Sequence, residues 1–241
     1  MLSSNKMERI KTYIDRLDEQ LEGGIPKGTI SLICGAAGCM KSSFAYSILY
    51  NNTLAGNLKG LYITLEQEVQ SLKQQMETLG MKEESEKLTI VSHKMIDTAT
   101  QLDMKFELNG IKKVKYYLDD LLKREDYDLI VVDSLNALYS LTSVKNPRRE
   151  AHLFFEGLRE TGITSFLISE MYLGDTKYGK YGVEEFLADA IIHLDIKRER
   201  DILERHLGIV KMRYTNHNLQ YFPLFYNNGR FIIYTKEEME L

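Results

Sequence analysis

Short aliphatic or β-branched runs alternate with longer amphipathic segments through most of this chain. Runs such as TISLICG and YDLIVVDSL are typical of buried strands, and segments whose apolar residues return every three or four positions are typical of helices. Strands are therefore predicted at residues 29–35, 60–66, 88–93, 127–135, 164–170 and 190–196. Helices are predicted, among other places, at residues 41–55, 69–79, 114–124 and 148–161.

The alternation of strand and helix predicts an α/β fold with a mainly parallel, twisted sheet and helices on both faces. The C-terminal part differs, because HLGIVKMRYTNHNLQYFPLFYNNGRFIIY holds strand-like pieces without a helix between them. Within it, Asn228-Gly229 is a strong hairpin turn signal. An antiparallel C-terminal extension of the sheet is therefore expected.

The composition is that of an ordinary globular protein. Hydrophobic residues make up 44% and charged residues 27% of the chain, so disorder is excluded as its main description. The length of 241 residues suits one large α/β domain, and no linker-like stretch rich in Pro, Gly or Ser divides it. We expect residues 1–241 to form a single domain.

Charge and cysteine content narrow the classes of partner. A net charge of −4 argues against binding nucleic acid through the overall field, although a local basic loop stays open. Cys34 and Cys39 are the two cysteines, too few for a disulfide framework or a cysteine zinc site. No apolar run reaches the roughly 20 residues of a membrane helix, and the first residues are too charged for a signal peptide. We expect a cytoplasmic protein without a membrane partner.

The segment GAAGCMKSS, residues 35–43, lies where a predicted strand ends and a predicted helix begins. It nearly matches the phosphate-binding loop pattern of glycine, four residues, glycine, lysine and then serine or threonine. In such loops, backbone N–H groups surround phosphate oxygens, the lysine contacts the β and γ phosphates, and the hydroxyl ligates Mg²⁺. Gly35, Lys41 and Ser42 occupy these positions.

Met40 stands where this pattern has its second glycine. Glycine there relaxes the backbone and admits the phosphate closely, so a methionine is expected to strain or reshape the loop. Taken alone, this degenerate loop leaves a functional and a non-functional site equally open.

Two carboxylates close other predicted strands. Asp133 ends the strand of YDLIVVDSL, as expected of the acidic residue that holds the water shell of Mg²⁺, although Asp-Ser after a buried strand is also a common turn. Glu66 ends GLYITLE, on a strand expected beside the other two. A carboxylate there can act as general base on the attacking water, and a solvated helix-cap glutamate is the alternative.

Together these motifs resemble the KaiC-like branch of the RecA-superfamily ATPases over almost the whole chain. YIDRLDEQLEGGIPKGTISLICGAAGCMKSSFA is similar to the family's leucine-aspartate helix, paired glycines, proline, basic residue and glycine before the phosphate loop. YDLIVVDSLNAL resembles the Walker B strand, and GITSFLISE, which ends in Glu170, resembles the strand after it. VEEFLADAIIHLD and GIVKMRYTNHNLQYFPLFYNNGRFII resemble the family's late segments.

The resemblance implies a RecA-like P-loop NTPase core that binds ATP and Mg²⁺, hydrolyses ATP and assembles into a ring, with a hexamer favoured. Ser42 and Asp133 would then position Mg²⁺, Asp133 through water, while Glu66 activates the attacking water. The nucleotide-binding residues would be Gly35, Ala36, Ala37, Gly38, Cys39, Met40, Lys41, Ser42 and Ser43.

The closing segment implies a site shared between subunits. In relatives, a lysine, a basic residue two positions on and a histidine four positions beyond it contact the neighbouring subunit's nucleotide. By that match Lys211, Arg213 and His217 act in trans. Their spacing also places Lys211 and Arg213 on one face of a strand. An exposed edge strand protected by charge explains both residues without a catalytic role.

Two departures from the family pattern keep a second hypothesis open. Met40 replaces a glycine, and Gln67 follows Glu66 where relatives usually have two adjacent glutamates. Slow or absent hydrolysis is consistent with both. The chain would then be a nucleotide-responsive regulatory or scaffold module that uses ATP to set assembly and partner binding.

Two charged segments bear on other partners. Arg148 and Arg149 follow the Walker B strand, where loops bind DNA in recombinase relatives, but a solvated first turn of the next helix is favoured. KRERDILERH, residues 197–206, is predicted to be a solvated hairpin connection or a subunit-contact loop. A recombination mediator that binds single-stranded DNA is therefore a third hypothesis, which the acidic net charge disfavours.

Overall fold

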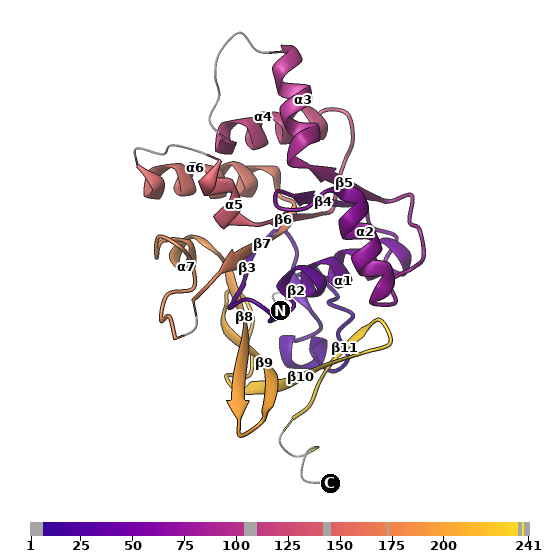
Figure 1. The fold of residues 1–241 in the computed structure, drawn as a ribbon, viewed down its shortest axis with the longest axis vertical. Coiled ribbons are helices and arrows are strands. Elements are labelled where there is room, and N and C mark those ends of the chain that lie inside the picture. The colour runs from indigo at the N-terminus through magenta and orange to yellow at the C-terminus, as the bar shows by residue number, and fades with distance from the viewer. Residues whose placement is uncertain (1–6, 104–109, 142–145, 173, 236–237, 239–241) are drawn as a thin grey trace, which may run out of the picture.

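The computed structural model describes residues 7–103, 110–141, 146–172, 174–235 and 238, and a nine-stranded sheet runs through its centre (Figure 1). The strand order is β11-β10-β9-β8-β3-β7-β6-β4-β5. The strands are β3 Ile30–Gly35, β4 Gly60–Thr64, β5 Leu88–Ser92, β6 Leu129–Asp133, β7 Thr164–Glu170, β8 Ala190–Glu199, β9 Ile202–Met212, β10 Tyr221–Asn227 and β11 Arg230–Ile233.

The direction of the strands confirms the predicted sheet. Neighbouring strands from β5 across to β8 are parallel. Those from β8 to β11 are antiparallel, which is the expected C-terminal extension. A separate two-stranded sheet pairs β1 Arg9–Ile10 with β2 Ile25–Pro26, and the short helix η1 Asp18–Leu21 lies between them in the chain.

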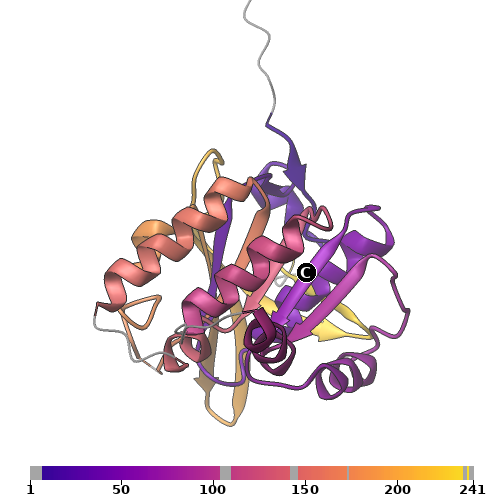
Figure 2. The ribbon, with the colours of Figure 1, turned by 90° about the horizontal axis from the view of Figure 1, so that it is seen from above.

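Helices cover both faces of the sheet, because parallel strands are joined by crossovers that return over one face or the other (Figure 2). The predicted helices correspond to α1, α2, α4 and α6, whereas α3, α5 and α7 were not predicted. The helices are α1 Lys41–Leu54, α2 Val69–Thr78, α3 His93–Asp103, α4 Gly110–Leu122, α5 Leu135–Ser140, α6 Pro147–Thr161 and α7 Glu184–Leu187. None of the described helices is long and apolar enough to cross a membrane.

Two hydrophobic cores lie on the two faces of the sheet. On one face α1 packs with α2 and the C-terminal strands, and Phe44, Tyr62 and Phe231 are fully buried there. On the other face α4, α5 and α6 cover the sheet, and Phe155 is fully buried there. This burial fixes the strand ends that carry the predicted site residues.

The parallel strands bring several predicted residues to one edge of the sheet. The phosphate loop follows β3, Glu66 follows β4, Asp133 ends β6 and Glu170 ends β7. We expected the strand before Glu66 to lie beside both the phosphate-loop strand and the Asp133 strand, and this was wrong. That strand, β4, neighbours the Asp133 strand β6, but β6 and β7 separate it from the phosphate-loop strand β3. It also ends at Thr64, so Glu66 lies in the connection to α2.

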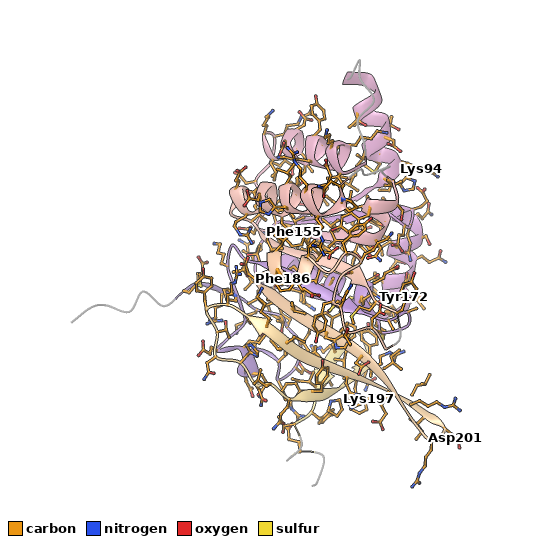
Figure 3. The ribbon with its side chains drawn as sticks, turned by 90° about the vertical axis from the view of Figure 1, so that its left-hand side faces the viewer. Lys94, Phe155, Tyr172, Phe186, Lys197 and Asp201 are labelled. Carbon is orange, nitrogen blue, oxygen red and sulfur yellow. The ribbon has the colours of Figure 1, made fainter. Side chains whose placement is uncertain are left out.

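The two charged segments of the sequence lie in a hairpin and in a helix, and a second hairpin holds the predicted turn. Residues 197–206 lie mostly in the paired strands β8 and β9, and the connection between them is Arg200-Asp201, at the tip that projects in Figure 3. The predicted turn at Asn228-Gly229 is confirmed, with φ values of 47° and 84°. Arg148 and Arg149 lie in the first turn of α6, as the favoured interpretation had it.

Candidate nucleotide-binding site

Residues 36–40 connect β3 to α1 and form the predicted phosphate loop. Gly35 cannot carry a side chain, because a Cβ there would lie 2.0 Å from the Leu194 carbonyl oxygen of β8. The first N–H groups of α1, from Lys41 on, have no acceptor within the helix. They and the helix dipole make this end of α1 suited to bind an anion.

Met40 adopts the left-handed conformation that the loop pattern assigns to glycine. Its φ and ψ are 65° and 30°, and its carbonyl oxygen accepts the N–H of Phe44 at 2.8 Å, which begins the helix. A left-handed backbone costs an L residue with a side chain roughly 1 kcal/mol. The partly buried Met40 side chain packs against the core on the α1 face. The loop therefore keeps the backbone conformation of the pattern although Met40 replaces glycine, and the backbone of Met40 is strained.

This strain predicts an unusual order of stabilities. We expect Met40→Gly to exceed Met40→Ala by about 1 kcal/mol in free energy of unfolding, since both lose the side chain but Gly alone removes the strain. Leu54, at the right-handed end of α1, provides the control. There, Leu54→Ala should be the more stable by about 1 kcal/mol. Urea unfolding without nucleotide measures both pairs, and the same order at both positions would contradict the assignment of strain.

A pocket of about 550 Å³ opens beside the loop. Two cations of its lining bind carbonyl oxygens of the loop: Lys41 Nζ donates to Ala36 at 2.9 Å, and Arg205 Nε donates to Gly38 at 3.1 Å. Both cations therefore lie beside the loop, in the lining of this pocket. The lining comprises Gly38, Met40, Lys41, Ser42, Ser43, Gln75, Thr78, Leu79 and Arg205.

Arg205 was not predicted as a site residue, because it lies in the segment that was expected to be a solvated connection. It belongs to β9 and pairs with Ile196 of β8. The alternation of side chains along the strand could have indicated the position of Arg205. Leu207 and Ile209 face the α1 side of the sheet, and Arg205 shares their parity.

Oxygen donors suited to Mg²⁺ meet next to the loop. Ser42, in the first turn of α1, lies beside the Asp133 carboxylate, and the Tyr62 hydroxyl donates to Asp133 Oδ2 at 2.6 Å. Burial raises the pKa of Asp133, while the hydrogen bond from Tyr62 and the charge of Lys41 lower it. Ser42 and Asp133 are hard ligands that fit Mg²⁺.

The described residues hold no group of three or more His, Cys, Asp or Glu that could bind a metal by itself. Mg²⁺ in nucleotide sites takes few protein ligands and completes its shell with phosphates and water. Ser42 and Asp133 therefore fit the ion in the presence of a nucleotide.

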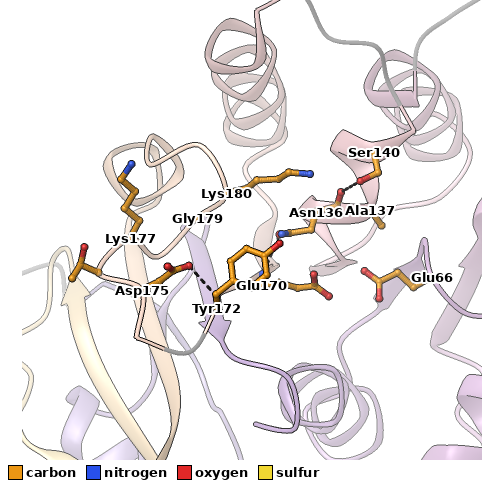
Figure 4. A pocket seen from close by; sticks show the side chains of 11 residues that line it. Glu66, Asn136, Ala137, Ser140, Glu170, Tyr172, Asp175, Lys177, Gly179 and Lys180 are labelled. Atoms are coloured by element: carbon orange, nitrogen blue, oxygen red, sulfur yellow. Dashed lines mark hydrogen bonds between the residues drawn. The ribbon is translucent and has the colours of Figure 1, made fainter.

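Glu66 lies on the other side of Asp133. Its Oε1 accepts the Ser134 hydroxyl at 2.5 Å, and Ser134 also caps α5 by accepting the N–H of Ala137. Glu66 lines a pocket of about 780 Å³, together with Glu170 at the end of β7 (Figure 4). The carboxylate is thus exposed, oriented by a hydrogen bond and able to reach a water molecule in the pocket.

The side chains of Lys211 and Arg213 bind the segment that precedes β8. Lys211 Nζ donates to the carbonyls of Ala188 at 2.6 Å and Glu185 at 3.0 Å, and Arg213 donates to Asp189 Oδ1 at 2.9 Å. Arg159 also approaches Asp189 Oδ2 at 3.5 Å. Two arginines therefore pair with the Asp189 carboxylate, and its charge also acts on Lys211. Burial and the charge of Arg213 lower the pKa of Lys211, whereas Asp189 raises it.

This cationic cluster and the phosphate loop lie at opposite ends of β3. Asp189 pairs with Ile30 at the start of the strand, whereas the loop follows Gly35 at its end. A strand of six residues separates its ends by roughly 17 Å. Lys211 and Arg213 are therefore directed away from the loop of their own chain. His217 is held differently, with Nδ1 3.3 Å from the Asn218 carbonyl.

Comparison with known proteins shows the family of the chain. The family model described as ATPase: KaiC matches residues 10–238. The chain belongs to the KaiC ATPase family. Among similar proteins, a UPF0273 protein of Aeropyrum pernix is 31% identical over 246 aligned positions, and the alignment covers 95% of this chain and 94% of that protein. A UPF0273 protein of Thermotoga maritima is 30% identical over 243 aligned positions, and the alignment covers 96% of this chain and 98% of that protein.

Circadian clock members of the KaiC family are longer. The circadian clock oscillator protein KaiC of Thermosynechococcus vestitus is 27% identical over 235 aligned positions, and the alignment covers 94% of this chain but 44% of that protein. The chain thus spans less than half the length of the clock proteins it matches. The crystal structure of a KaiC-like protein from Pyrococcus horikoshii OT3 has a TM-score of 0.80 at 25% identity, covering 95% of this chain and 100% of that one. The RecA-like fold implied by the resemblance is confirmed.

The two cysteines of this KaiC-family chain lie at the loop but are shielded. Cys34 and Cys39 are both fully buried and form no disulfide. Burial raises the pKa of the Cys39 thiol, and the nearby Lys41 lowers it by less. Because thiolates react and buried neutral thiols do not, both cysteines serve as small packing residues here.

Proposed function

We propose that this chain is a Mg²⁺-dependent ATPase. The observation that carries the proposal is the meeting of three groups at one edge of the sheet. These are the loop ending in Lys41, the Ser42–Asp133 pair and the exposed carboxylate of Glu66. Phosphoryl transfer needs such an arrangement, because its catalysis consists mainly of positioning and of stabilising charge.

Each group has a role in this proposal. The N–H groups at residues 35–43, with Lys41 and Arg205, bind the phosphates, and Ser42 and Asp133 hold Mg²⁺, Asp133 through water. When bound, the ion neutralises charge on the β and γ phosphates. Glu66 takes a proton from the water that attacks the γ-phosphorus, and ADP leaves with the electrons of the broken P–O bond.

We further propose that residues 1–241 are one domain, and that copies of it form a ring with nucleotide at the subunit interfaces. The position of Lys211 and Arg213 supports shared sites, since both lie at the end of β3 remote from their own loop. An interface that joins two different surfaces closes into a ring when the rotation allows it. Family analogy favours a hexamer, with His217 also contributing in trans.

ATP hydrolysis with Mg²⁺, measured over a range of protein concentrations, tests this function. Specific activity should rise with concentration, because sites shared between subunits exist in the assembled state. Activity independent of concentration, in a protein that remains monomeric, would contradict the shared site. Omission of Mg²⁺ should abolish turnover.

A nucleotide-responsive regulatory or scaffold module remains the second candidate. Two observations favour it: Met40 is strained within the loop, and Gln67 has a buried side-chain oxygen without a hydrogen-bond partner in the described structure. The nucleotide retained through purification separates the candidates. Retained ATP would indicate a module that does not hydrolyse it, whereas ADP would indicate turnover. Arg148 and Arg149 give no added support to single-stranded DNA binding, since both begin α6.

A further inference from the structure

Tyr62 reaches the predicted Mg²⁺ site from within the core. In the register of β4 and β6, Thr64 pairs with Asp133 and Tyr62 pairs with Val131. Side chains two residues apart on a strand share a face, so Tyr62 lies on the same face as Asp133. The phenol follows β4 toward its carboxyl end, and its hydroxyl donates to Asp133 Oδ2 at 2.6 Å.

The Tyr62 ring is buried in the core and packs against another aromatic ring. Tyr62 is fully buried, and its ring packs against that of Tyr46 from α1 at a centroid distance of 5.6 Å. Ser42, the other predicted Mg²⁺ ligand, lies near both Tyr62 and Asp133. The phenol therefore binds one predicted ligand directly, at the end of β6, and lies close to the other, in the first turn of α1.

We infer that Tyr62 is a positioning residue for the Mg²⁺ site, an inference that rests on the proposed function. The buried hydroxyl donates to Oδ2, and this hydrogen bond restrains the orientation of the Asp133 carboxylate. A carboxylate that holds a metal through water depends on such outer partners for its orientation. Tyr62 thus couples the core packing of β4 and α1 to the affinity for the ion.

A purely structural role of Tyr62 predicts a different result. If the Tyr62 hydroxyl served merely to satisfy a buried carboxylate, its removal would lower the stability of the protein and leave the response to Mg²⁺ unchanged. A positioning role requires a change in the Mg²⁺ dependence itself. Nucleotide binding measured with and without the ion distinguishes the two.

The test compares Tyr62→Phe with wild type and with Tyr46→Phe. Tyr46→Phe removes a nearly buried hydroxyl from the ring that packs on Tyr62, and therefore controls for the loss of a phenol at this place. Binding of a non-hydrolysable ATP analogue is measured in EDTA and over a titration of free Mg²⁺. For Tyr62→Phe, the Mg²⁺ concentration at half effect should rise about ten-fold. Affinity in EDTA should match wild type, which also reports an intact loop.

Each outcome decides the inference. An unchanged Mg²⁺ midpoint in Tyr62→Phe, with a normal dependence in wild type, overturns the positioning role and leaves the proposed ATPase untouched. An equal shift in Tyr46→Phe also overturns it, because the effect would then follow from packing. Binding by wild type that does not respond to Mg²⁺ refutes the metal-dependent function and this inference together.

Discussion

Replacing Glu66 by glutamine should reduce ATP turnover by at least about 100-fold while leaving ATP affinity unchanged. The glutamine is isosteric and its side-chain oxygen can still accept the Ser134 hydroxyl, as Oε1 does at 2.5 Å in the structure. It cannot take a proton from the attacking water. The substitution therefore removes the base without disturbing its surroundings, and a loss confined to turnover is the expected result.

The matched control is Glu170→Gln, which changes a second carboxylate of the same pocket. Glu170 lines that pocket with Glu66, and its backbone N–H donates to Asn136 (Figure 4). The pocket thus loses one negative charge in either variant. Steady-state hydrolysis and equilibrium ATP binding are measured on both. Full turnover in Glu66→Gln would exclude Glu66 as the base, and equal losses in both variants would indicate an effect of pocket charge.

Most of the fold could be predicted because the local pattern and the parallel topology agree. The unpredicted helices have identifiable causes. α5 is six residues long, shorter than the window in which a helical period can be recognised. α3 begins at His93, directly after β5, so no turn residue marks the boundary. The order of the strands depends on crossovers between distant segments. The position of β7 between β3 and β6 therefore could not be predicted from the local sequence pattern.

The candidate site could be predicted where a motif carries the chemistry. Lys41, Ser42 and Asp133 stand in recognisable patterns, and the structure places all three together. Tyr62 and Arg205 had no such pattern. Both reach the site along a strand from the α1 face of the sheet, so their positions depend on register between strands. Register can be stated once the pairing partners are known.

Arg213→Ala should lower ATP turnover about a thousand-fold if Arg213 acts on the γ-phosphate of a neighbouring subunit. A guanidinium near the transferred group stabilises the charge that develops there, and the geometry excludes its own loop as the target, since β3 separates the two. ATP affinity should fall far less than turnover, because the contact is strongest in the transition state. Single-turnover hydrolysis with saturating protein measures the effect.

The same substitution also removes a partner of Asp189, and this has to be controlled. Asp189 is nearly buried and binds both Arg213 at 2.9 Å and Arg159 at 3.5 Å. Arg159→Ala therefore weakens the same carboxylate cluster from the helix side without removing the proposed trans group. Turnover near wild type in Arg159→Ala, with a large loss in Arg213→Ala, assigns the loss to catalysis. Equal losses would assign it to the folding of the 185–189 segment.

Mixing two inactive variants tests the shared site directly. Lys41→Ala removes the phosphate-binding lysine, and Arg213→Ala removes the proposed trans group, so each should be inactive alone. In a mixed ring, an intact site forms wherever the loop of an Arg213→Ala subunit meets Arg213 of a Lys41→Ala subunit. Random assembly of equal amounts should restore activity at about a quarter of the sites. If both groups act within one chain, no mixture has an intact site, and the mixed protein stays as inactive as its components.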